Sequence, residues 1–427
     1  MRLKLILAGL FLNLISVGAS GDALKSKADP LIDAVRDKVI AWRRDIHEHP
    51  ELGNREFRTA ALIAEHLRSL GMEVKTEVAH TGVVGLLRGA ADKPVVALRA
   101  DMDALPVTER VDLPFASKVR STYQGTEVGV MHACGHDNHV AILMGVAEVL
   151  ASMRDSIPGS VKFIFQPAEE GPPAGEDGGA EVMIAEGVLT DVDAIFGLHV
   201  GPAPLGTIGY RSGGMMASSD SFSITVKGRQ THGAVPWGGV DPIVIASQII
   251  MGLQTIPSRQ LDSTLTPSII TVGKISGGVR FNIIPDEVEM LGTIRTFDSE
   301  VREDIHARIK RTAESIAESA GGTAIVDISK GTPVTSNDPE LTRLMVPTLQ
   351  EAAGIDKVGE YPRVTTGEDF AYYQKQIPGM FFFLGVADPD DARPASNHSP
   401  YFYADERALP VGVKALTYLA LDYLSKE

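Results

Sequence analysis

The sequence lacks several features, and each absence narrows the class of protein. It has one cysteine, Cys134, in 427 residues, so the chain cannot form a disulfide within itself. Its 40 basic residues are outnumbered by 55 acidic ones, and a formal charge of −15 disfavours binding to nucleic acid. Low-complexity runs and short repeats are also missing. With 44% hydrophobic and 22% charged residues, the composition is typical of a globular protein of about two domains.

A run of apolar residues long enough to cross a bilayer is also missing. The N-terminal run "LILAGLFLNLISV" has 13 residues, whereas a span needs about 20. Basic "MRLK" precedes it and small "GAS" follows it, which is the order of a secretory signal peptide. We therefore predict a signal peptide over 1–19, export to a periplasm or the medium, and no membrane contact after cleavage; a membrane anchor is the alternative. Losing Arg2 and Lys4 changes the formal charge from −15 to −17.

The single thiol lies in "MHACGHDNH", residues 131–139, among three histidines. A lone exported thiol is buried and inert, paired with another chain, or bound to a ligand. Gly135 separates Cys134 from His136 and lets both side chains face one ion, and a thiolate beside imidazole is a soft metal site. The alternative is a buried cysteine among helix-capping polar residues. We expect His132, Asp137 and His139 to support or cap rather than to bind the ion.

After the predicted signal peptide, the chain begins with two helices. We expect Asp29 to cap the first and Pro30 to be its first residue, and Gly71 to end the second. Apolar runs then alternate with helical segments. The runs predicted as buried strands of this part are 95–99, 161–166, 193–198 and 380–386. The alternation predicts an α/β domain with a mostly parallel central sheet.

A different pattern occupies residues 212–329. It begins with "SFSITVKGR", which alternates between apolar and polar residues like a half-exposed strand. Predicted elements follow in the order β-α-β-β-α-β, with helices near 241–255 and 299–319 and strands near 268–276, 287–297 and 323–329. This order is that of a ferredoxin-like α+β sandwich. We therefore predict a discontinuous larger domain, 30–211 and 330–427, with a smaller domain inserted.

Acidic and histidine residues follow the predicted strands of the larger domain. They are Asp101 and Asp103 in "RADMDALP", Glu169 and Glu170 in "QPAEEG", His199 in "GLHV" and His398 in "NHSP". Ligands of open α/β sheets bind at the carboxyl ends of strands, so these side chains are expected to converge near Cys134. Adjacent glutamates point different ways, so one can bind metal while the other faces a reacting water. Taken singly, each motif also fits a capped turn, an exposed acidic turn or a core histidine.

Three polar residues of the inserted domain lie at predicted turns or strand ends. They are His232 in "THGAVPW", Asn282 in "RFNIIPD" and Arg295 in "GTIRTF". Either they clamp a substrate carboxylate and hold an oxyanion, or they are ordinary turn and surface residues. The Gly/Pro-rich acidic loop 171–180 is either a flexible rim of the site or a solvated loop.

Ten motifs occur in the order seen in a known family. They are "DIHEHPELG", "RADMDALP", "MHACGHDNH", "QPAEEG", "GLHV", "THGAVPW", "FNIIPD", "GTIRTF", "TTGEDF" and "NHSP". Over about residues 30 to 425 the chain resembles the amidohydrolase branch of the dinuclear-zinc aminoacylase and carboxypeptidase family. That branch includes hippurate hydrolases, N-acyl-L-amino-acid amidohydrolases and plant indole-acetyl-amino-acid hydrolases. The resemblance implies a catalytic α/β domain with an inserted α+β lid or dimerisation domain over 212–329.

The resemblance also implies residue roles. The positions that match the metal ligands of the branch are Cys134, His136, Glu170, His199 and His398. Glu169 matches the general base, and Asp103 matches the acid that supports the metals. His232, Asn282 and Arg295 match lid residues that reach the substrate, and a homodimer is expected because similar enzymes supply His232 across the dimer interface. Asn138 replaces a usual glycine, and loop 171–180 is longer and more acidic than in the simplest members; both bear on substrate range.

The expected activity is metal-dependent hydrolysis of the amide bond of a small N-acyl amino acid. We expect two divalent ions per chain, zinc first, with manganese, cobalt or nickel as alternatives. Glu169 is expected to move the proton, His232 to stabilise the oxyanion, and Arg295 with Asn282 to hold the substrate carboxylate. The alternatives are a dipeptidase or carboxypeptidase on the same metal core, a cysteine amidase with Cys134 as nucleophile, and a non-catalytic binding protein.

Overall fold

The computed structural model describes residues 4–426, and describes side chains from residue 21 onward. The side chains of the predicted signal peptide lie outside this range, so its cleavage stays a prediction. The chain divides into two compact units. The first comprises the chain up to residue 213 with 337–361 and 372–427, and the second comprises 214–336 and 362–371. The boundaries expected from the sequence, at 211/212 and 329/330, remain predictions of where the domains meet.

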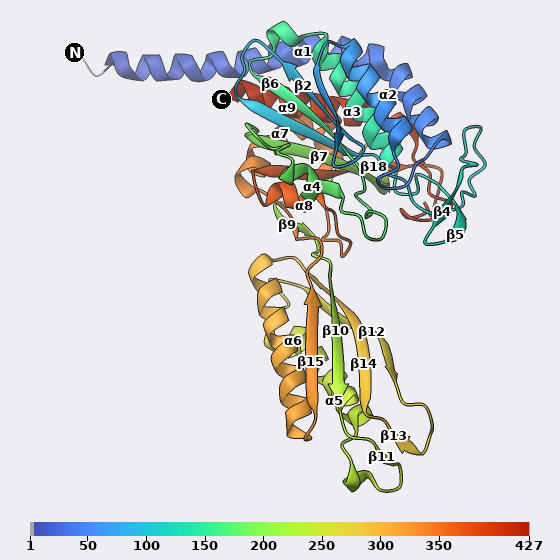
Figure 1. Cartoon of the computed structure of the whole chain (residues 1–427). Coiled ribbons are helices and arrows are strands. Elements are labelled where there is room, and N and C mark those ends of the chain that lie inside the picture. Colours follow the sequence, from blue (N-terminus) through green and yellow to red (C-terminus); the bar gives the residue numbers. More distant parts are fainter. Residues whose placement is uncertain (1–3, 427) are drawn as a thin grey trace. The chain divides into compact units, whose positions relative to one another are not determined.

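The first unit contains an eight-stranded sheet in the order β1-β2-β6-β3-β7-β18-β8-β17 (Figure 1). Its strands are Glu73–Val78 (β1), Gly82–Arg88 (β2), Val95–Asp101 (β3), Ser160–Gln166 (β6), Ala194–Pro204 (β7), Ile208–Tyr210 (β8), Val358–Glu360 (β17) and Gly379–Ala387 (β18). The central strands β6, β3, β7 and β18 run parallel, and every residue of β3 is buried. The predicted α/β domain with a mostly parallel sheet is therefore confirmed.

Helices cover this sheet. They are Lys4–Glu48 (α1), Phe57–Ser69 (α2), His136–Ala151 (α3), Gly179–Ala185 (α4), Pro339–Ala353 (α7), Phe370–Gln374 (α8) and Leu409–Lys426 (α9). Helices α3 and α9 pack against β3 and β7, and α1 packs across both of those helices. Gly71, at φ +72°, follows α2 and ends it as predicted. Every helix within residues 4–426 is too short or too polar to cross a bilayer.

The predicted start of the first helix is wrong. Helix α1 begins at Lys4 and passes through Asp29 and Pro30 without a break. The Asp29 carboxylate does not cap this helix, because it accepts a hydrogen bond from the Tyr418 hydroxyl at 2.7 Å and lies 2.9 Å from the Lys414 ammonium. Both partners belong to α9, along which α1 packs. Tertiary packing thus offsets the backbone hydrogen bond that Pro30 removes, and the local signal for a helix start is overridden.

The second unit contains a four-stranded antiparallel sheet in the order β12-β14-β10-β15. Its elements are Asp220–Lys227 (β10), Pro242–Thr255 (α5), Ser268–Gly277 (β12), Glu287–Thr296 (β14), Ser299–Ser319 (α6) and Thr323–Ser329 (β15). The predicted β-α-β-β-α-β order and ferredoxin-like sandwich are confirmed.

Short strands also form two-stranded sheets outside these two sheets. They are Arg120–Tyr123 (β4) with Thr126–Gly129 (β5), Gly213–Met216 (β9) with Thr335–Asn337 (β16), and Thr231–His232 (β11) with Ile283–Ile284 (β13).

The sheet of the second unit has one covered face and one open face. Alternate residues of β10, such as Ile224 and Val226, are buried in a core shared with α5 and α6. Residues of opposite orientation, such as Ile269 on β12 and Ile325 on β15, are exposed. The open face thus presents apolar side chains to the surroundings in the described chain.

Two buried carboxyl groups hold the turn that follows β6. The N–H of Ala168, a residue at φ +51°, donates to Glu56 Oε1 at 2.9 Å. The next two N–H groups, of Glu169 and Glu170, donate to the two oxygens of Asp103 at 3.1 and 3.0 Å. Three successive backbone donors are therefore satisfied by two side chains from elsewhere in the chain. These bonds stabilise a backbone conformation that alanine rarely adopts. They therefore fix the backbone positions from which the side chains of Glu169 and Glu170 extend.

Glu56 is a residue whose importance the sequence did not reveal. Its side chain is fully buried, and its second oxygen accepts a hydrogen bond from the Thr81 hydroxyl at 2.5 Å. Burial, and then the charge of Asp103, raise the pKa of Glu56 to about 8. The carboxyl group is therefore mostly neutral at pH 7.

Replacing Glu56 by alanine should destabilise the protein, because it leaves two buried groups without partners at about 1–3 kcal/mol each. We expect Glu56→Gln, which keeps the shape and an acceptor for Ala168, to lose less free energy of unfolding in urea. Because the folded-state pKa is raised from 4.5, the stabilisation by neutral Glu56 is complete below about pH 4.5 and lost as the pH rises through about 8. Wild type should therefore lose stability relative to Glu56→Gln between about pH 5 and pH 9. Equal losses in both variants, independent of pH, would contradict this account.

Candidate metal centre

The five predicted metal ligands come from four places in the first unit. Cys134 precedes α3, His136 is the first residue of α3, Glu170 follows β6, His199 lies in β7 and His398 follows β18. His199 does not end its strand, as we expected, because β7 continues to Pro204. Gly135 has φ +94°, and a Cβ there would lie 2.4 Å from Val200 Cγ2. The cysteine and histidine are therefore joined by a residue that has to be glycine.

The structure brings these five side chains together. Cys134 Sγ lies 3.3 Å from His199 Nε2 and 3.2 Å from His398 Nε2. His398 Nε2 lies 2.9 Å from Glu170 Oε1. Two groups of three side chains place their ligand atoms within 4.8 Å of one another: Cys134 with His136 and His199, and Cys134 with Glu170 and His398. Cys134 belongs to both groups, as a ligand shared by two ions would.

The histidine rings are oriented for a metal. Nδ1 of His199 lies 2.7 Å from the Val200 carbonyl, to which it donates when protonated, so Nε2 faces Cys134 with its lone pair. His136 Nδ1 lies 3.2 Å from Asp103 Oδ1, while its Nε2 is buried without a hydrogen-bond partner among the described residues. Burial lowers the pKa of His199 to about 3, which keeps this imidazole neutral. A ring fixed at one nitrogen and free at the other is the usual state of a metal-binding histidine.

The charges of the cluster also fit a cation. Burial opposes a proton on His136, but Asp101 and Asp103 outweigh it and raise the pKa of His136 to about 10. Burial, then the charges of Glu170 and Glu169, raise the pKa of the Cys134 thiol. Negative charge is thus concentrated in a buried space, and thiolate, imidazole and carboxylate together are ligands that suit zinc. The residues present therefore fit a metal centre.

Glu169, the predicted general base, lies beside these ligands. Its Oε2 is 3.9 Å from His136 Nε2, and one ligand atom from each of His136, Glu169 and Glu170 lies within 4.8 Å of the other two. Asn138, where the family branch usually has glycine, donates to the Gly135 carbonyl at 3.2 Å and to Asp137 Oδ1 at 3.0 Å. Asn138 therefore stabilises the start of α3 locally.

Other residues of the cysteine motif make supporting contacts. His139 Nδ1 lies 2.5 Å from Asp101 Oδ1, and its Nε2 accepts the N–H of Val200 at 2.8 Å, so neither ring nitrogen is free for a metal. Asp137 lies 2.8 Å from His47 Nδ1. His132 is buried with neither ring nitrogen hydrogen-bonded among the described residues.

Some supporting residues went unassigned in the sequence. His47 contacts Asp137 and also lies 3.1 Å from Glu109, and Arg43 Nε lies 2.8 Å from the same aspartate. His47 belongs to the motif "DIHEHPELG", which we recognised in the sequence. The motif did not reveal which residues His47 contacts. Contacts between residues 90 positions apart have no local signal.

The three predicted substrate-binding residues lie in the second unit. Asn282 adjoins His232, since β11 pairs with β13 and the Gly233 N–H donates to the Asn282 carbonyl at 2.9 Å. Arg295 lies at the opposite end of β14, where its guanidinium donates to Ser219 Oγ at 2.7 Å. A strand of ten residues spans about 30 Å at about 3.4 Å per residue. One chain therefore does not bring Arg295 to the same point as Asn282.

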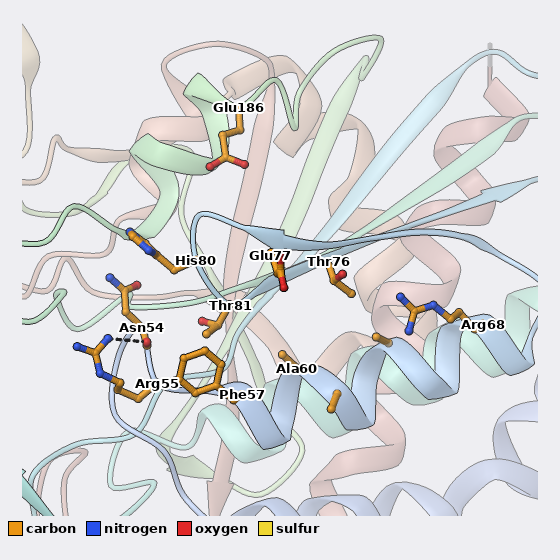
Figure 2. A pocket seen from close by; sticks show the side chains of 12 residues that line it. Asn54, Arg55, Phe57, Ala60, Arg68, Thr76, Glu77, His80, Thr81 and Glu186 are labelled. Atoms are coloured by element: carbon orange, nitrogen blue, oxygen red, sulfur yellow. Dashed lines mark hydrogen bonds between the residues drawn. The ribbon is translucent and has the colours of Figure 1, made fainter.

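Two of the cavities in the described part of the chain lie in the first unit. One, of about 360 Å³, is lined by Glu170 and Asp103 among others. The other, of about 720 Å³, lies between α2 and the β1–β2 turn and is lined by residues such as Arg55, Phe57 and His80 (Figure 2). None of the predicted site residues lines the larger cavity. Of these two cavities the smaller one lies beside the metal cluster, so size alone does not identify the reacting site.

Known proteins are similar to this chain over most of its length. The chain is 42% identical over 398 residues to thermostable carboxypeptidase 2 of Saccharolobus solfataricus, covering 92% of this chain and 98% of that protein. It is 40% identical over 398 residues to the N-acetyl-L-cysteine deacetylase of Bacillus subtilis, covering 93% and 90% respectively. A Bacillus subtilis crystal structure described as a dinuclear metal-binding peptidase of the M20 family matches with a TM-score of 0.77 and 38% identity, over 92% of this chain and 99% of that one.

The match to a family model agrees with these relatives. The model of peptidase family M20/M25/M40 matches residues 97–422. This range contains both groups of clustered ligands and the whole second unit. The resemblance that we drew from the ten motifs is therefore confirmed. The chain belongs to peptidase family M20/M25/M40, whose members are metal-dependent hydrolases of amide and peptide bonds.

Proposed function

We propose that this enzyme hydrolyses the amide bond of N-acyl amino acids with two divalent metal ions, one in each group of ligands. The observation that carries the proposal is the sharing of Cys134 by two three-residue groups beside Glu169. Zinc is the metal that the thiolate, imidazole and carboxylate donors favour, and manganese, cobalt or nickel are alternatives. The relatives named as a deacetylase and a carboxypeptidase support cleavage of an amide next to an amino acid.

Each residue of the proposed site has its own role in the reaction. When bound, the ions lower the pKa of water from about 15.7 towards 7 and polarise the amide carbonyl. Glu169 accepts a proton from the attacking water and returns it to the nitrogen of the leaving amine. Asp103 holds the Glu169 backbone and one ring nitrogen of His136, so it positions both base and ligand. His232 donates a hydrogen bond to the oxyanion, and Arg295 or Asn282 binds the free carboxylate.

A dipeptidase or carboxypeptidase activity on the same centre is the second candidate, because a relative at 42% identity is named as a carboxypeptidase. Both substrate classes present an amide bond next to a carboxylate. They differ in the acyl part, which carries a free α-ammonium in a dipeptide and lacks one in an N-acyl amino acid.

We also propose that the enzyme is a homodimer through its second unit. Val279, Phe281 and Trp237 are 95%, 94% and 81% exposed, and they lie on the segments that carry Asn282 and His232. Large apolar side chains exposed to this degree are typical of an interaction site. A dimer also explains why His232 and Asn282 lie far from Arg295 along β14, since two chains can supply one substrate pocket.

Export is a further proposal. The N-terminal basic, apolar and small residues support it, and cleavage after Ala19 would leave a chain that begins at Ser20.

The metal content and the role of Glu169 can be tested together. Elemental analysis of the purified mature protein should find about two metals per chain, and Cys134→Ala should lose a large part of them because both groups lose a ligand. Glu169→Gln should keep the metals and lose turnover of N-acetyl- and N-benzoyl-amino acids. Full activity of Glu169→Gln would exclude the mechanism. Faster turnover of unblocked dipeptides than of N-acyl amino acids in wild type would favour the second candidate.

The dimer can be tested at Phe281. Phe281→Asp places a charge in the proposed interface, so light scattering after gel filtration should show monomers and turnover should fall. Ile355→Asp, at a residue 68% exposed in the first unit, is the matched control and should stay dimeric and active. A monomeric wild type with full activity would rule out the shared site.

Export can be tested by expression of the full chain in a bacterium with a periplasm. Intact mass and N-terminal sequencing should show a protein that starts at Ser20 and fractionates outside the cytoplasm. A protein that retains residues 1–19 in the cytoplasmic fraction would disprove cleavage.

A further inference from the structure

The smaller cavity has walls that enclose a space next to the metal cluster. Four segments form it: 52–55, 103–106, the β4–β5 hairpin at 121–124, and 170–174. Glu170, one of the clustered ligands, belongs to the wall. Whatever fills this space therefore lies beside the bond that reacts. The volume of about 360 Å³ is at the small end of the range for ligand pockets.

Apolar residues make up much of the wall, together with three charged residues and the neutral polar side chains of Ser121, Thr122 and Gln124. Its apolar residues include Leu52, Leu105, Pro106, Tyr123, Pro172 and Pro173. Arg55, the cation of the wall, pairs with Glu176 at 2.5 Å. Asp103 accepts two backbone N–H groups, and Glu170 contacts His398. The wall therefore offers no unpaired cation to a substrate carboxylate, and its apolar residues favour an apolar group.

The wall is also held in place. Glu176 of loop 171–180 accepts hydrogen bonds from Asn54 as well as Arg55, and Asn54 donates to the Asp177 carbonyl at 3.0 Å. These bonds favour a fixed rim over the flexible one considered from the sequence. The tip of the hairpin has two residues, Gln124 and Gly125, both at positive φ, which matches the twist of a tight hairpin. Tyr123 is therefore presented from a rigid turn.

We propose that this cavity binds the acyl group of the substrate and selects apolar, flat acyl groups such as benzoyl over acetyl. The inference rests on the proposed hydrolysis of N-acyl amino acids and names the part of the substrate that the first unit recognises. Proline and tyrosine walls offer flat surfaces that stack with a planar group, and a single apolar contact changes selectivity by about 10- to 200-fold. The amino-acid carboxylate is then left to Arg295 or Asn282, as proposed above.

The test compares kcat/KM for N-benzoyl- and N-acetyl-methionine in the metal-loaded full-length enzyme. Tyr123→Ala removes one wall and should lower the benzoyl-to-acetyl ratio about tenfold, because a benzoyl ring loses more contact with this side chain than an acetyl group does. Ala174→Trp adds bulk at an exposed wall residue and should lower the same ratio by excluding the larger group. Phe57→Ala is the matched control, because this exposed ring lines the larger cavity and does not line the smaller one, so the ratio should stay at the wild-type value (Figure 2).

The outcomes separate the two proposals. An unchanged ratio in both Tyr123→Ala and Ala174→Trp, with wild type hydrolysing both substrates, overturns the acyl cavity and leaves the hydrolase intact. A change in Phe57→Ala equal to that in Tyr123→Ala also overturns it, because the effect is then not local. Failure of wild type to hydrolyse either substrate overturns the proposed function and this inference with it.

Discussion

The binding of three successive backbone N–H groups by Glu56 and Asp103 is the interaction on which the site depends. Strand β6 ends at Gln166, and the chain then has to place two glutamates among four imidazole and thiol groups. A turn with an alanine at φ +51° holds only because its surroundings determine it. Both carboxyl groups are buried, so the arrangement costs desolvation that the parallel sheet and its covering helices have to offset.

Much of the fold and of the metal cluster could be predicted because the signals were local or ordered. The β-α-β-β-α-β pattern appeared in hydrophobic periodicity, and Cys134 and His136 stood together around a glycine. The placement of Glu170, His199 and His398 after or within parallel strands followed from the rule that such strands end at one edge of a sheet. For this reason residues up to 264 positions apart, Cys134 and His398, could be expected to meet.

The remainder depended on contacts that have no local signature. Asp29 looked like a helix cap, but a tyrosine and a lysine from α9 use its carboxylate instead. Glu56 looked like one of 55 acidic residues, and only its burial beside Asp103 distinguishes it. Asn282 precedes β14 and Arg295 lies near the end of this strand, so the two residues are far apart. The order of motifs along the sequence does not specify this distance.

Because two groups of clustered side chains share one sulfur atom, modification of that atom disrupts both groups. An oxidant or alkylating agent that modifies Cys134 removes a donor from both groups in one event, and the chain has no second thiol to intercept the reagent. Burial limits this weakness, because it raises the pKa of the thiol and keeps the metal-free side chain in its less reactive protonated form. The same sulfur would thus be inert in the empty protein and indispensable in the loaded one.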